Sequence, residues 1–89
     1  MLVSSPDAYK TVPQIQEKII DIICHEMETP RAGLSGLAAF ADLGLDSFSF
    51  LNILGQLEDW LDLELDLNEL AACKTISALA ETLGAMQKP

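Results

Sequence analysis

Apolar residues recur every three or four positions over several stretches of this chain, which is the spacing of amphipathic helices. The first stretch spans residues 12–27 and begins with a capping-box pattern, in which Thr11 precedes Gln14 by three positions. Pro13 suits the first turn of a helix. We therefore predict a helix over residues 12–27 with one buried stripe. That stripe consists of Val12, Ile15, Ile19, Ile22, Ile23 and Met27.

A second periodic stretch spans residues 47–61 and follows Asp46, a residue type that caps helix N-termini well. At 100° per residue, its apolar stripe consists of Phe50, Ile53, Leu54, Leu57 and Leu61. The opposite face consists of Phe48, Asn52, Gly55 and Asp59, and Leu51 lies on its flank. We therefore expect Phe48 to point away from the core. A glycine inside a helix costs about 1 kcal/mol relative to alanine, and core packing does not explain Gly55 on this outer face.

Two further helices are expected after residue 61. Asp66 and Glu69 form a second capping-box pattern, which predicts a short helix over about residues 67–72. Thr75 is the expected cap of a last helix, and Gly84 is its expected stop. The apolar face of that helix consists of Ile76, Leu79, Ala80 and Leu83.

The connection over residues 28–46 is long for a compact domain, and connections of this length are often functional. Pro30 and three glycines interrupt any long helix there, while the leucines and Phe40 predict that the connection packs onto the rest. No stretch shows a strand pattern. We predict an all-α, four-helix bundle over residues 11–84, with a long first loop and a short third helix. Residues 1–10 and 85–89 are expected to be tails.

Charge changes this picture through its placement. The 89 residues form one small domain with a formal net charge of −9. No basic residue lies between Arg31 and Lys74, whereas eight acids do. Such a field repels nucleic acid and anionic membranes, and it attracts a partner with a basic patch. The eight acids are Asp42, Asp46, Glu58, Asp59, Asp62, Glu64, Asp66 and Glu69.

Several classes of function are disfavoured by missing patterns. The apolar runs are too short to cross a membrane, and the first ten residues have no secretion-signal pattern, so we expect a cytoplasmic protein. Cys24 and Cys73 are expected to be reduced, without a metal site. The single histidine, His25, has no pattern that links it to a serine nucleophile, and the usual phosphate-loop and dinucleotide motifs are absent. We therefore do not expect an enzyme.

Ser47 is the residue whose position suggests chemistry. It falls in the first turn of a predicted helix, where unpaired backbone N–H groups and the helix dipole favour a phosphate. An exposed serine hydroxyl at this place can carry a phosphodiester without disturbing the fold. From spacing alone, an ordinary helix-start serine beside the cap Asp46 explains the residue equally well.

The stretch "DLGLDSFSFLNILGQLEDWLDLELD" resembles the phosphopantetheine attachment region of acyl and peptidyl carrier proteins. The family pattern is Asp-x-Gly-x-Asp-Ser-Leu at the start of the second helix, and Asp42, Gly44, Asp46 and Ser47 match it. The length, helix order, long first loop and acidity also fit. The resemblance covers about residues 12–84.

The resemblance implies that a phosphopantetheinyl transferase attaches 4'-phosphopantetheine from coenzyme A to Ser47, and that Asp46 meets this transferase. The arm's thiol would hold an acyl or aminoacyl group as a thioester. A loading ligase and downstream synthase, transferase or tailoring enzymes are the further implied partners, and the carrier itself is expected to be a monomer. The expected partner contacts lie on the second helix: Phe48, Leu51, Asn52, Gly55, Glu58 and Asp59.

The chain departs from the family pattern in ways that bear on its pathway. Phe48 replaces the usual leucine, and Ser49 and Asn52 stand where fatty-acid-type carriers usually have acids. We therefore expect a free-standing carrier in specialised polyketide or nonribosomal peptide-type biosynthesis. One alternative is a fatty-acid-type acyl carrier protein. A second is an unmodified acidic helical module that binds a protein partner through Glu58 and Asp59.

Overall fold

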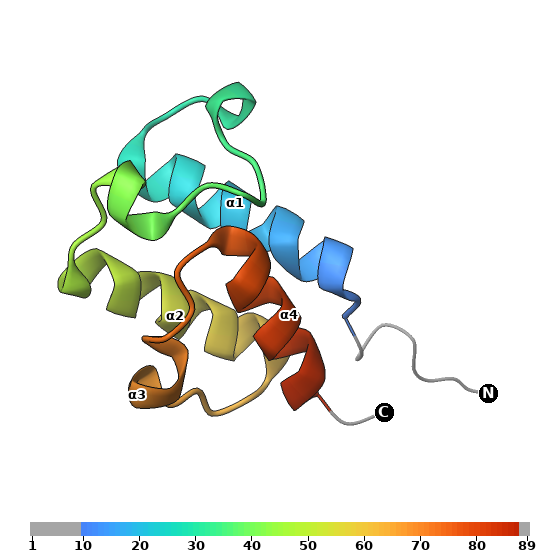
Figure 1. Ribbon diagram of the computed structural model, residues 1–89. Coiled ribbons are helices and arrows are strands. Elements are labelled where there is room, and N and C mark those ends of the chain that lie inside the picture. The colour runs from blue at the N-terminus through green and yellow to red at the C-terminus, as the bar shows by residue number, and fades with distance from the viewer. Residues whose placement is uncertain (1–9, 88–89) are drawn as a thin grey trace.

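The computed structural model of the protein describes residues 10–87, and all of its regular elements are helical (Figure 1). Over these residues the only strand-like pairing is an isolated bridge between Ala39 and Thr75. The all-α prediction is thus confirmed. Residues 1–9 of the predicted N-terminal tail, and residues 88–89, lie outside the described residues. The elements in order are α1 (Val12–Met27), η2 (Arg31–Gly33), η3 (Phe40–Leu43), α2 (Ser47–Leu61), α3 (Leu67–Leu70) and α4 (Ile76–Met86).

The helix starts follow from their capping residues. Thr11 and Gln14 complete the predicted capping box at α1, and Thr75 caps α4 by accepting a hydrogen bond from the Ala78 N–H. The bounds of α1 and α2 agree with the prediction. Helix α3 is shorter than predicted. Asp66 accepts from the Asn68 N–H at 2.9 Å, one residue earlier than a capping box requires.

The prediction that Gly84 ends the last helix is wrong, because α4 continues to Met86 and Gly84 is buried inside it. A Cβ atom at Gly84 would lie 2.7 Å from Val12 Cγ2, so the missing side chain lets α1 and α4 approach closely. Met86 and Gln87 pack with the bundle, which differs from the expectation of a tail from residue 85. Gln87 is buried, and its side chain bonds both the backbone N–H and the carbonyl of Lys10.

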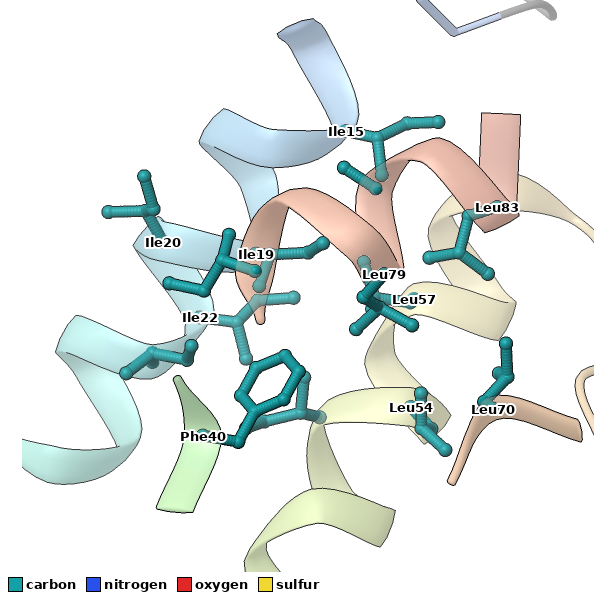
Figure 2. Close-up of a cluster of buried hydrophobic side chains, with 14 of the residues drawn as sticks. Ile15, Ile19, Ile20, Ile22, Phe40, Leu54, Leu57, Leu70, Leu79 and Leu83 are labelled. Atoms are coloured by element: carbon teal, nitrogen blue, oxygen red, sulfur yellow. The ribbon is translucent and has the colours of Figure 1, made fainter. Parts of the chain in front are cut away.

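The core lies where α1 faces α4 and α2 (Figure 2). Ile15, Ile19 and Ile23 on α1 are fully buried, as are Leu79 and Leu83 on α4. Fully burying one such side chain favours folding by about 1.5–3 kcal/mol. This contact therefore supplies much of the stability. The remaining buried apolar residues are Ile20, Ile22, Phe40, Ile53, Leu54, Leu57, Leu61, Leu70, Ile76 and Ala80.

The long connection between α1 and α2 is packed down, as predicted. Its Phe40 is buried, and the ring meets Phe50 of α2 edge-on with centroids 5.3 Å apart. Backbone hydrogen bonds tie the same segment to the start of α4: Phe40 N–H donates to the Lys74 carbonyl, and Ser77 N–H donates to the Gly36 carbonyl. Arg31 pairs with Glu17 and Asp21 of α1. The chain therefore enters α2 from a fixed position.

Candidate functional site

Ser47 is exposed at the first position of α2, and a tight turn places it there. Gly44 closes η3 with a φ of 76°, in the left-handed region that favours glycine. Leu45 and Asp46 then run without regular structure into the helix, with Asp46 extended at φ −92° and ψ 180°. The local sequence thus turns the chain sharply and presents the serine hydroxyl at a helix N-terminus.

Asp46 caps α2 and is exposed. Its Oδ1 accepts a hydrogen bond from the Ser49 N–H at 2.8 Å. That bond, followed by the contribution of the Ser49 side chain, holds the pKa of the Asp46 carboxyl below its usual value. The carboxylate is therefore ionised at neutral pH and stands directly beside Ser47.

A groove of about 450 Å³ opens beside Ser47. Its walls come from four segments: η3, the start of α2, α3, and the connection from α3 to α4. The sequence pattern did not reveal this groove, because only the fold brings these segments together. Phe50, which the pattern placed on the core stripe, is half-buried and forms part of the wall. The lining residues are Ala39, Phe40, Ala41, Leu45, Asp46, Ser47, Phe50, Leu67, Ala71, Cys73 and Lys74.

The outer face of α2 next to Ser47 is apolar and accessible. Phe48 is 74% exposed and Leu51 is 47% exposed, so the predicted outward direction of Phe48 is confirmed. Gly55 is exposed, with open space where a Cβ would stand. Asn52 donates a hydrogen bond to Glu26 Oε2 of α1 at 3.4 Å. A carboxylate from α1 therefore lies beside Asn52, the residue that stands where fatty-acid-type carriers usually have an acid.

The predicted partner residues do not form one continuous set. Glu58 is half-buried, and its Oε2 accepts a hydrogen bond from the Leu65 N–H at 2.8 Å, which closes the connection from α2 to α3. Asp59 is exposed one residue later. At a rise of about 1.5 Å per residue, Asp59 lies about 18 Å along the helix axis from Ser47. These two acids therefore belong to the far end of α2.

Metal-binding clusters and membrane-spanning helices are absent from residues 10–87. No group of three or more His, Cys, Asp or Glu side chains there could hold a metal ion. Cys24 and Cys73 are free and half-buried, and His25 is exposed near the end of α1. None of the described helices is long and apolar enough to cross a membrane.

Comparisons with known proteins point to one kind of protein. The family described as "Phosphopantetheine attachment site" matches residues 17–83. Polyketide synthase 1 of Metarhizium brunneum is 36% identical over 66 residues, or 74% of this chain. Non-reducing polyketide synthase terA of Aspergillus terreus is 44% identical over 64 residues, or 66% of this chain. The chain spans about 3% of the length of these curated relatives.

A solved structure is similar over most of both chains. It is the crystal structure of a free-standing peptidyl carrier protein from an uncharacterized secondary metabolic pathway of Acinetobacter baumannii. The two sequences are 32% identical, and the structures superpose with a TM-score of 0.77. The similarity covers 84% of this chain and 94% of the other.

Proposed function

This chain belongs to the family of carrier proteins that bear a phosphopantetheine attachment site, and on that premise we propose that Ser47 is the residue that holds the arm. The observation that carries the proposal is an exposed serine in the first turn of α2, directly after the Gly44 turn and Asp46. When bound, 4'-phosphopantetheine supplies a thiol that holds cargo as a thioester. The carrier family is not itself catalytic, so the chemistry belongs to partner enzymes.

The surroundings of Ser47 suit a phosphodiester. The first N–H groups of α2 have no partners within the helix, and the positive end of the helix dipole lies at the same place. Because the serine side chain is exposed, modifying it displaces no core residue. The ionised carboxylate of Asp46 keeps a negative charge directly beside Ser47. We infer that this carboxylate meets the transferase, through a metal ion or a basic side chain of that enzyme.

The relatives and the surface support an inference about the type of pathway that this carrier serves. The similar proteins are polyketide synthases and a peptidyl carrier protein of a secondary metabolic pathway. We infer that this chain is a carrier in specialised biosynthesis of the polyketide or nonribosomal peptide type, loaded by a separate ligase. Ser49 and Asn52 stand where fatty-acid-type carriers usually present acids, and together with the exposed apolar side chains of Phe48 and Leu51 they favour this over fatty-acid-type synthesis.

Mass spectrometry tests the attachment. The purified chain is incubated with coenzyme A and a broad-specificity phosphopantetheinyl transferase, and we expect a mass gain of one phosphopantetheine group. Ser47→Ala should abolish the gain. Ser49→Ala is the matched control, because it removes a hydroxyl two residues away in the same turn and should leave the gain intact. No gain in the wild-type chain with any transferase tried would overturn the proposal.

A further inference from the structure

The outer face of α2 beside Ser47 is uncharged. No acidic or basic residue occurs in α2 before Glu58. Phe48, Leu51 and Gly55 are exposed there at spacings of three and four residues, so they lie along one stripe of the helix. An enzyme that reaches the Ser47 hydroxyl must cover part of this outer stripe, because Phe48 is the next residue and Leu51 lies about one turn further on.

A carboxylate from α1 is bound at the edge of this outer stripe. Asn52, which follows Leu51, donates a hydrogen bond from its side-chain amide to Glu26 Oε2 at 3.4 Å. Both residues are exposed. The last turn of α1 and the first turns of α2 lie at the same end of the bundle (Figure 1). Glu26 therefore places a negative charge beside a surface of α2 that has none of its own.

Folding does not explain a carboxylate at Glu26. The residue lies in the last turn of α1, where the negative end of the helix dipole disfavours an acid. Arg31 makes the ion pairs formed within residues 10–87, with Glu17 and Asp21, so no cation in that part of the chain neutralises Glu26. Its bond to Asn52 joins two exposed side chains and competes with water. The charge is therefore open to a cation supplied by a partner.

We propose that Glu26 is the anionic contact for the transferase that modifies Ser47, and that Asn52 is the residue that positions it. This inference rests on the proposed attachment at Ser47. The matching enzyme surface presents an apolar pocket for Phe48 and a lysine or arginine at the rim of that pocket for Glu26. Asn52 follows Ser47 by about 7.5 Å along the helix axis. That separation fits within the roughly 800 Å² that a standard interface covers on each partner.

The two residues should act on different quantities. A charge at the rim of an interface acts mainly on association and on its salt dependence. Loss of the Glu26 charge should therefore lower kcat/KM for arm transfer and leave kcat nearly unchanged. Asn52 acts only through Glu26, so its removal should matter only while the carboxylate is present.

The test measures arm transfer from coenzyme A by a phosphopantetheinyl transferase at several carrier concentrations. Glu26→Gln keeps the side-chain shape and an acceptor oxygen for Asn52 but removes the charge. We expect kcat/KM to fall about threefold. Glu81→Gln is the matched control, because Glu81 is exposed on α4 and loses the same charge away from Ser47. It should keep the wild-type value. Urea midpoints verify that each variant is folded.

A charge swap separates positioning from a purely structural role. Glu26→Gln combined with Asn52→Asp exchanges the amide and the carboxylate within the same pair, and we expect most of the lost kcat/KM to return. Asn52→Ala should lower kcat/KM in the wild-type chain and add no loss in Glu26→Gln. In 1 M salt, where the Debye length is about 3 Å, wild type and Glu26→Gln should become nearly equal.

The outcomes separate this inference from the proposed function. Equal kcat/KM in wild type and Glu26→Gln would overturn the role of Glu26. Equal losses in Glu26→Gln and Glu81→Gln would overturn it too, because net charge would then be the cause. A charge swap without recovery, or a further loss when Asn52→Ala is added to Glu26→Gln, would overturn the positioning role of Asn52. Absence of any mass gain in the wild-type chain would instead contradict attachment at Ser47.

Discussion

The two ends of α2 present different surfaces. At the N-terminal end, an exposed serine stands between the groove and an apolar face formed by Phe48 and Leu51. At the C-terminal end, about 18 Å away along the axis, carboxylates gather. They belong to Glu58, Asp59, Asp62 and Glu64, which line a surface depression together with Leu63.

This difference suggests a division of work along one helix. Charges act over roughly a Debye length, about 8 Å at physiological ionic strength, whereas apolar contacts act only on touching surfaces. We therefore expect the acidic end to attract a basic partner during approach, and the apolar end to decide whether the docked partner fits around Ser47. Glu58 complicates this division, because its carboxylate is already bound to the Leu65 N–H.

Among the variants that test this difference between the two ends of α2, we expect the largest effect from a charge placed at the apolar end. Phe48→Asp should lower kcat/KM for arm transfer by about tenfold or more, because a buried aromatic anchor in an interface contributes about 2 kcal/mol or more. The urea midpoint should stay unchanged, since Phe48 is 74% exposed in the free protein. Gln56→Asp is the matched control, with the same added charge at another exposed position of α2. Equal losses in the two variants would mean that added charge, and not Phe48, is responsible.

At the acidic end, neighbouring carboxylates should differ in how much they contribute to the free energy of unfolding. Glu58→Ala removes the acceptor of the Leu65 N–H, and we expect the free energy of unfolding to fall by about 1–2 kcal/mol. Asp59→Ala removes an exposed group and should change it by no more than about 0.5 kcal/mol. Urea titrations of both variants measure this. A similarly small change in both variants would contradict a stabilising role for the hydrogen bond between Glu58 and the Leu65 N–H.

The smallest effect concerns the cap beside Ser47, and it depends on pH. Asp46→Ala loses the acceptor for the Ser49 N–H, so the unfolded fraction at pH 7 should rise roughly fivefold. Because the folded-state pKa of Asp46 lies below its ordinary 3.8, its stabilising contribution is complete above that value. It is lost as the pH falls through the lowered pKa. The urea midpoints of wild type and variant should therefore converge in acid, and a gap that stays constant down to that range would contradict the cap.

Local features of the sequence were sufficient to predict the main helices. The bounds of α1 and α2 follow from Thr11, Asp46 and a 3.6-residue period, all of which act within a few residues. The outward direction of Phe48 follows from the same period. These features could be read without knowing what packs against what.

Features set by distant contacts could not be predicted in this way. Glycine is a residue type that often ends helices, but Gly84 lies inside α4, where the close approach of Val12 leaves no room for a side chain. The groove needs four segments that only the fold assembles. Glu26 accepts a hydrogen bond from Asn52, which lies 26 residues later in the sequence, and Glu58 accepts one from the Leu65 N–H, seven residues later. Each of these features depends on a contact with a residue that lies outside the local sequence pattern.

The hydrogen bonds between the Gln87 side chain and the Lys10 backbone hold residues 10 and 87 together, so they also determine from which side the domain can be attached. The Lys10 ammonium lies 5.1 Å from the centroid of the Trp60 ring, which places this junction at the C-terminal end of α2. Ser47 lies at the other end of that helix (Figure 1). A neighbouring domain or a solid support joined on either side would therefore hold the bundle from one pole. The opposite pole would remain free to swing toward successive enzymes.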